Sequence, residues 1–93
     1  MNWYGAKLIF RSEIDGSVEG EHLWEESIRV LTAESEEEAR ADAVIVGKAA
    51  EHSYLNATGE TVCWRFHEVQ EIQDLCVSEL TQGTEVFSRL FRQ

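Results

Sequence analysis

The chain has 93 residues, of which 43% are hydrophobic and 10% aromatic. That is enough apolar material for one compact domain over residues 1–93 and excludes a globally disordered chain, but the length leaves no room for a second core. Eighteen acidic residues against eight basic ones give a net charge of −10, which argues against nucleic acid as a partner, because binding the phosphate backbone needs a basic surface.

The sequence also lacks the features of a membrane or exported protein. No apolar run approaches the ~18 residues of a membrane-spanning helix, and the first residues lack the basic and apolar stretches of a signal peptide. We therefore expect no membrane contact and a cytoplasmic location, in which Cys63 and Cys76 are reduced thiols.

Most of the negative charge is concentrated in one segment. Ten acidic residues and a single basic one, Arg29, lie between Glu13 and Glu38, so this segment carries −9 of the total of −10. Carboxylates near a helix N-terminus are stabilised by the helix dipole, and a charged surface keeps a protein soluble, so a solvated face is the favoured interpretation. The alternative is an acidic surface that attracts a basic protein partner.

The first third of the chain predicts a β-hairpin. Residues 3–14 alternate between apolar and polar side chains, as in a half-buried strand. Asp15-Gly16 is a turn signal, and residues 23–32 return as a second, antiparallel strand. The apolar residues of one parity in this second strand are Trp24, Ile28 and Val30.

A helix is predicted to follow, because Ser35 and Glu38 form a capping box. The Ser35 hydroxyl can accept a hydrogen bond from the N–H of Glu38, whose carboxylate reaches back to the N–H of Ser35. From there the helix is expected to run to about His52. Small apolar residues recur on one face, which predicts close packing on a sheet, and these are Ala39, Ala43, Val46 and Ala50.

Two apolar residues of this helix, Val44 and Ile45, fall off the stripe of small residues. We expect them to be partly exposed and to be candidate contacts of a homodimer, which the small core and the sheet edges also favour. The net charge opposes close contact between two copies. Gly47 inside the helix indicates either a close approach of its backbone to a neighbouring element or an early break.

The remaining sequence predicts two more strands. Residues 61–69 alternate, and the parity slips beyond them, which a bulge near Glu68 would explain. Residues 74–80 fit either a helical turn or a short strand. After a turn at Gln82-Gly83, a last strand is expected over residues 85–91.

Together these elements predict a single α+β domain, with an antiparallel sheet of about four strands in β-β-α-β-β order and one main helix packed on one face. No internal repeat or linker divides the chain. The side of the core opposite the helix stripe is expected to consist of Leu8, Phe10, Ile28, Val30, Trp64, Phe66 and Leu90.

Several motifs resemble those of one bacterial family. They are Trp3-Tyr4-x-Ala6-Lys7-Leu8-Ile9-Phe10-Arg11, Trp24-Glu-Glu-Ser-Ile28, Ala33-x-Ser35-x-Glu37-Glu38-Ala39, Trp64-x-Phe66 and Gly83-Thr-Glu-Val-Phe-Ser-Arg-Leu90. In this order, and over nearly the whole chain, the sequence resembles the domain-of-unknown-function family 4288. The resemblance implies a small prokaryotic cytosolic protein and supports the element order, and it brings no activity, cofactor or catalytic residue.

The residues that could carry chemistry do not form a recognisable site. The spacing motifs of zinc sites are lacking, and Cys63 and His67, on one face of a strand, would lie roughly 13 Å apart, too far to share an ion. Cys63 and Cys76 have apolar sequence neighbours and are expected to be buried thiols rather than nucleophiles. We therefore expect no metal, no cofactor and no enzymatic activity.

Strand parity predicts a basic and aromatic face on the side of the sheet turned away from the helix. Five of the eight basic residues have this parity, namely Lys7, Arg11, Arg29, Arg65 and Arg89. Trp3 and Phe87 lie among them, and three acidic residues reduce the sum to +2. One interpretation is a solvated face whose cations pair with cross-strand carboxylates. The other is a surface for an anionic ligand, a single-stranded nucleic acid or an acidic patch of a second copy.

Two functions of different classes follow. The first is a non-enzymatic protein-interaction module, which associates with itself as a homodimer or binds a basic protein partner, as an inhibitor or immunity protein does. The second is a small domain that binds an anionic ligand or single-stranded nucleic acid on the open sheet face.

Overall fold

The structure is a computed structural model that describes residues 1–16, 22–88 and 91–92. In these ranges the chain forms β1 (Asn2–Ile14), β2 (Trp24–Ala33), α1 (Glu36–Ala49), β3 (His52–Leu55) and β4 (Thr61–Asp74). The predicted α+β fold and its β-β-α-β-β order are confirmed. No helix in the described ranges is long and apolar enough to cross a membrane.

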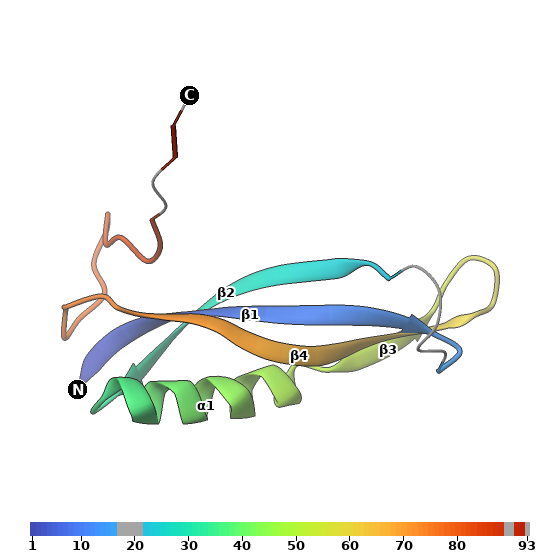
Figure 1. The fold of residues 1–93 in the computed structure, drawn as a ribbon, viewed down its shortest axis with the longest axis horizontal. Coiled ribbons are helices and arrows are strands. Elements are labelled where there is room, and N and C mark those ends of the chain that lie inside the picture. Colours follow the sequence, from blue (N-terminus) through green and yellow to red (C-terminus); the bar gives the residue numbers. More distant parts are fainter. Residues whose placement is uncertain (17–21, 89–90, 93) are drawn as a thin grey trace.

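The four strands form one antiparallel sheet in the order β2-β1-β4-β3, with α1 against one face (Figure 1). β1 is a central strand and β2 lies at one edge. The β1–β4 ladder shifts register twice, between Lys7 and Leu8 and between Ile9 and Phe10, where β4 contains an extra residue. These irregularities lie on either side of Glu68, where the parity slip predicted a bulge.

α1 packs through its small residues, as the stripe predicts. Ala39 and Ala43 are fully buried, and Ala43 contacts the core residues of β1. Gly47 is buried against β4, where a Cβ atom would overlap the ring of Phe66. The close backbone approach at this glycine is therefore confirmed, because the Phe66 ring leaves no room for a larger side chain.

The N-terminal cap of α1 is confirmed with one difference. The N–H of Glu38 donates to Ser35 Oγ at 3.1 Å. The Glu38 carboxylate, however, accepts a hydrogen bond from the N–H of Glu34 at 3.4 Å instead of from Ser35. The cap thus satisfies two backbone donors, as a capping box does, with the second donor displaced by one residue.

The second half of the chain differs from the prediction in its strands. α1 ends at Ala49 rather than near His52, and residues 52–55 form β3, which pairs with the start of β4. β4 continues beyond its predicted end to Asp74, because its bulges let the ladder with β1 go on. The described residues of the predicted last strand, 85–91, form no strand.

The chain after β4 forms neither the helical turn nor the strand that the sequence left open. Cys76 has a φ of 60°, outside the strand region, and its N–H donates to the Asp74 carboxylate at 2.7 Å. The N–H of Leu75 donates to the carbonyl of Trp3 at 3.0 Å, and the N–H of Trp3 donates to the carbonyl of Val77 at 2.9 Å. This segment therefore follows the first residues of β1.

The core lies between α1 and the centre of the sheet. Leu8 and Phe10 are buried as predicted, and Trp64 and Phe66 pack against them. The rings of Phe10 and Phe66 meet edge to face, with their centroids 5.9 Å apart. Leu90, the last predicted core residue, lies outside the described residues.

The predicted core positions in β2 are wrong. Ile28 is paired with Lys7 and Val30 with Gly5, so both side chains lie on the side of the sheet turned away from α1. Leu31, which has the other parity, packs against the core instead. Apolar residues do alternate in β2, but the side chains of Ile28 and Val30 lie on the side of the sheet away from α1.

Candidate interaction surfaces

We define the open face as the surface of the sheet turned away from α1. Lys7 and Arg11 of β1 lie on it, because they alternate with the core residues of that strand. Arg65 lies directly opposite Arg11 in the β1–β4 register and shares the face. Trp3 has the same parity and is half-buried. The structure thus brings these four predicted residues to one surface.

Another predicted member of the basic face, Arg29, lies on the other side of the sheet. Arg29 is paired with Ala6, which belongs to the core, so Arg29 lies on the helix side of the sheet. Its Nε donates to Ser27 Oγ at 2.9 Å. The prediction that Arg29 lies on the open face is wrong for the same reason as the core prediction. The even-numbered side chains of β2 lie on the open face, and the odd-numbered ones lie on the helix side. Arg89 lies outside the described residues.

Lys7 is held by its own chain. Its Nζ lies 3.1 Å from a carboxylate oxygen of Glu26 on β2 and 3.6 Å from one of Glu71 on β4. The ring of Phe87 covers it, with the ring centroid 4.0 Å from Nζ. Only 11% of the Lys7 side chain is exposed, so the ammonium group is occupied by internal contacts.

The two arginines of the open face share one carboxylate. Oxygen atoms of Glu13 lie 3.5 Å from Arg11 Nη2 and 3.5 Å from Arg65 Nε. The Arg11 guanidinium also lies 5.9 Å from the centroid of the Trp24 ring, which in turn meets the ring of His67 edge to face. The described cations of this face are therefore paired with cross-strand or neighbouring carboxylates.

The charge of the open face differs from the prediction. The charged residues that the strand registers place on it are three cations and four carboxylates, namely Lys7, Arg11, Arg65, Glu13, Glu26, Glu68 and Glu71. The face carries −1 from these described strand residues rather than +2. This arrangement favours the first interpretation of the open face, a solvated surface whose cations pair with its own carboxylates.

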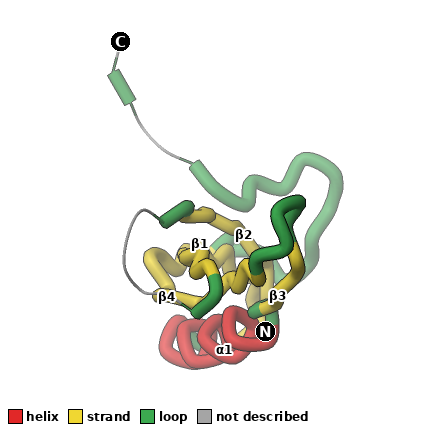
Figure 2. The backbone as a smooth tube through the Cα atoms, turned by 90° about the vertical axis from the view of Figure 1, so that its right-hand side faces the viewer, coloured by secondary structure: helices red, strands yellow, loops and turns green. Residues whose placement is uncertain are grey.

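The C-terminal segment covers part of the open face. Figure 2 shows the chain after β4 on the side of the sheet opposite α1. The carbonyl oxygen of Val86 lies 2.5 Å from where a Cβ atom of Gly5 would be, so glycine is needed for this close approach. Phe87 lies on the open face as predicted, although the residues around it form no strand.

β2 exposes large apolar side chains beside the covered part of the open face. Trp24 is 54% exposed, and Ile28 and Val30 are each 41% exposed. We call these three residues the β2 row. Because they share one parity, they line the outer margin of the sheet as an apolar strip, which Glu26 interrupts between Trp24 and Ile28.

The backbone of β2 is also available along its outer edge. The N–H of Ser12 donates to the carbonyl of Leu23 at 2.9 Å, in register with the β1–β2 ladder. Hydrogen bonding alternates along an antiparallel pair, so the odd-numbered residues of β2 bond to β1. The N–H and C=O groups of the even-numbered residues, which include the β2 row, then point outward. No described strand pairs with this edge.

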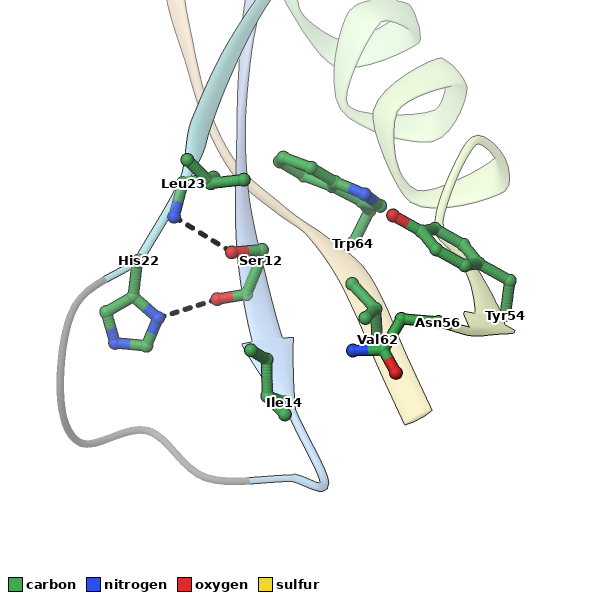
Figure 3. Close-up of a pocket in the computed structure, with 8 residues that line it drawn as sticks. All are labelled: Ser12, Ile14, His22, Leu23, Tyr54, Asn56, Val62 and Trp64. Carbon is green, nitrogen blue, oxygen red and sulfur yellow. Dashed lines mark hydrogen bonds between the residues drawn. The ribbon is translucent and has the colours of Figure 1, made fainter. Parts of the chain in front are cut away.

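A groove lies at the end of the sheet that α1 does not reach. Its volume is about 400 Å³. The lining residues are mainly apolar and come from the sheet strands and the flanking loops (Figure 3): Ser12, Ile14, His22, Leu23, Tyr54, Asn56, Val62 and Trp64. α1 underlies only the half of the sheet near the chain's N-terminus (Figure 1), which is why these side chains are not covered by it.

Ser12 and His22 in this groove resemble a nucleophile and its base but are not arranged as one. His22 Nδ1 lies 2.6 Å from the main-chain carbonyl oxygen of Ser12 (Figure 3). The Ser12 hydroxyl accepts a hydrogen bond from the N–H of Leu23 at 2.9 Å. The contact of His22 thus positions the chain at the start of β2, and it does not place this ring nitrogen on the Ser12 hydroxyl.

The structure places no metal-binding cluster in the described residues. No group of three His, Cys, Asp or Glu side chains there could hold an ion. Cys63 is half-buried on β4. Cys76 is exposed, which corrects its prediction as a buried thiol, because the chain leaves the sheet at the positive φ of this residue.

The described residues of the acidic segment do not form one surface. Glu13 and Glu26 lie on the open face in ion pairs, whereas Glu25 lies on the helix side of β2. Further glutamates, at positions 36–38, form the first turn of α1, where the helix dipole favours negative charge. The described acidic side chains are thus divided among three parts of the molecule.

The candidate dimer contacts on the helix lie apart from the β2 row. Ile45 is 67% exposed and Val44 is half-buried. Both belong to α1, which packs on the opposite side of the sheet from the open face (Figure 2). Their role in a dimer remains a prediction. The β2 row is the apolar surface that sequence reasoning missed, because its alternation is equally typical of a core strand.

Comparison with known families supports the resemblance seen in the motifs. The chain matches the family described as Domain of unknown function (DUF4288) over residues 3–88 and belongs to that family. No curated protein and no solved structure matches it.

Proposed function

We propose that this member of the family is a non-enzymatic protein-interaction module of the bacterial cytoplasm that binds another polypeptide chain through the outer edge of β2. The observation that carries the proposal is the combination of outward-facing backbone groups with the β2 row on one edge strand. An edge of this kind accepts an added strand, whose backbone supplies affinity and whose side chains supply specificity.

The charges of the molecule favour this site over the alternatives. The open face carries its described cations in ion pairs with its own carboxylates, so it offers little to an anionic ligand or a nucleic acid strand. The acidic residues that the structure describes in this segment are dispersed, so among themselves they provide no single surface for a basic partner. The apolar edge of β2 needs neither, because backbone pairing and apolar contact do not require a charged patch at the site.

The experiment compares two lysine substitutions at exposed apolar residues. Val30→Lys places a charge in the β2 row, and Ile45→Lys places the same charge on α1 as the matched control. Each purified variant is examined by sedimentation at micromolar concentration and as bait in a nuclease-treated native lysate. We expect Val30→Lys to weaken association with a protein, whether a second copy or another chain, by at least about tenfold, and Ile45→Lys to have no effect.

Two outcomes would contradict the proposal. If Ile45→Lys abolishes association and Val30→Lys does not, the interface lies on α1. If wild-type protein neither self-associates nor retains any protein after nuclease treatment, β2 is a solvated edge.

A further inference from the structure

We infer that the chain that pairs with β2 is a second copy of the same protein, joined to the first across a two-fold axis at Ser27. This inference rests on the proposed function and names its partner. Antiparallel pairing of the two β2 strands would join two four-stranded sheets into one. A closed dimer of this type uses the same edge on both copies.

The hydrogen-bonding pattern of β2 restricts the registers that are open to such a dimer. Because the even-numbered residues of β2 point their backbone groups outward, they must face even-numbered residues of the second copy. In a two-fold dimer the symmetry axis must then pass through a residue of β2 rather than between two residues. The charged residues of β2 lie between positions 25 and 29, and the axes nearest the middle of this stretch pass through Glu26, Ser27 or Ile28.

Charge selects Ser27 among these three axes. With the axis at Ser27, Glu25 of each copy lies directly opposite Arg29 of the other, on the helix side of the sheet. Within the described residues, neither Glu25 nor Arg29 has an ion-pair partner of its own, since Arg29 bonds only to the Ser27 hydroxyl. The dimer would form two cross-strand ion pairs from side chains that the single chain leaves unpaired.

The neighbouring registers lack this match. An axis at Glu26 places two identical carboxylates directly opposite each other, which is destabilising. An axis at Ile28 places Glu25 opposite Leu31 and Arg29 opposite Ser27, so the two opposite charges do not meet. Only the Ser27 axis pairs the unlike charges of the strand.

The same register brings the β2 row of each copy together on the open face. Trp24 lies opposite Val30 of the second copy, an aromatic and β-branched pair that stabilises antiparallel strands. Ile28 lies opposite Glu26, whose carboxylate is already held by Lys7 of its own chain at 3.1 Å. The Trp24–Val30 contacts would cover part of the exposed apolar side chains at both ends of the paired strands.

The first test is disulfide trapping in a Cys63→Ser/Cys76→Ser background, which removes both native thiols. Ser27→Cys is expected to form a covalent dimer on mild oxidation, because Cα atoms in a non-hydrogen-bonded antiparallel pair lie about 4.5 Å apart, within disulfide range. Glu26→Cys and Ile28→Cys, each alone, are the matched controls for the other two axes. A mixture of these two variants should cross-link, since residues 26 and 28 face each other across the Ser27 axis.

The second test reverses the charges that set the register. Glu25→Arg and Arg29→Glu, each alone, should raise the dimer dissociation constant at least about tenfold. The double variant Glu25→Arg/Arg29→Glu should restore it, because both ion pairs form again with the charges exchanged. Sedimentation equilibrium measures all four proteins at the same salt concentration.

The outcomes separate this inference from the proposed function. A monomeric wild type with no cross-link at Ser27→Cys overturns the dimer, and capture of a different protein that Val30→Lys abolishes would still support the module. Cross-linking of Glu26→Cys or Ile28→Cys alone overturns the Ser27 register. Failure of the double charge reversal to restore association overturns the ion pairs.

Discussion

β1 and β2 are neighbours in one hairpin, yet they place their apolar residues in opposite ways. In β1 the alternating residues Tyr4, Leu8 and Phe10 are at most 4% exposed and lie under α1. In β2 the alternating apolar residues form an exposed row on the other side of the sheet. An apolar alternation therefore identifies a strand with two unlike faces, but it does not say which face meets the core.

The position of α1 explains the difference between the two strands. α1 packs on β1, β4 and the last residues of β2, where Leu31 and Ala33 reach the core. Toward the other end, Ser27 and Arg29 occupy the helix side of β2, where Arg29 is exposed. The β2 row therefore contributes little to the core of the single chain, and contact with another chain would give these residues a role.

The largest effect should come from truncating the two strands at comparable positions. Leu8→Ala is expected to lower the free energy of unfolding by about 2–5 kcal/mol, because it leaves a cavity at a fully buried site. Ile28→Ala should cost less than about 1 kcal/mol at concentrations where the protein is monomeric, since the side chain is already exposed. Urea unfolding of both variants measures the contrast, and equal losses would show that β2 faces a core after all.

The packing of α1 on β1 can be tested by enlarging a side chain of α1 instead of truncating one of β1. Ala43→Leu should destabilise the protein by about 1–3 kcal/mol, because Ala43 is fully buried against β1. Ala41→Leu is the control on the exposed side of α1 and should change stability by less than about 0.5 kcal/mol. A neutral result at Ala43 would mean that α1 does not pack tightly on β1.

A smaller and more local test addresses the contact between α1 and β4. Gly47→Ala should destabilise the protein by about 1 kcal/mol or more, because the new methyl group meets the Phe66 ring. A smaller side chain in Phe66→Leu should relieve part of this clash, so the double variant should lose less than the sum of the single losses. Additive losses in thermal or urea unfolding would show that the two residues do not meet.

The smallest effect is confined to alkaline pH and to the start of β1. Burial raises the pKa of the Tyr4 hydroxyl above its usual 10.0, and the carboxylates of Asp74 and Glu36 raise it further. Above pH 10 the unfolded chain loses this proton before the folded one does, so stability should fall as pH rises through that region. Tyr4→Phe should make this alkaline decline shallower while leaving neutral stability nearly unchanged. Unfolding curves at several pH values give the slope, and an unchanged slope would exclude Tyr4 as its cause.

The parts of the fold that were predictable depend on local signals. The alternation of residues 3–14 and the Ser35–Glu38 cap define β1 and the start of α1, because strand parity and capping are decided by near neighbours in sequence. The small residues of α1 likewise predicted its packing face. These elements are sufficient for the α+β fold and its order.

The errors arose where distant partners decide the structure. β3 is too short and too exposed to show alternation, so only its pairing with β4 reveals it. The apolar residues near Phe87 alternate like a strand, yet they lie across β1, where Gly5 leaves room for the backbone. The sequence pattern of β2 predicted that Arg29 lies on the open face, and with it a net basic face. The β1–β2 register shows instead that Arg29 lies on the helix side.

The sheet order β2-β1-β4-β3 has a consequence for how the chain is assembled during synthesis. β1, one of the two inner strands, is made before the other strands, but its second neighbour, β4, is complete only when Asp74 has left the ribosome. Until then the nascent chain holds the β1–β2 hairpin, α1 and β3, but β1 lacks its second neighbour and α1 lacks the strand β4 on which it also packs. Pairs such as Tyr4 with Asp74 close a loop over most of the chain, so the domain should fold late and more slowly than a helical domain of its size.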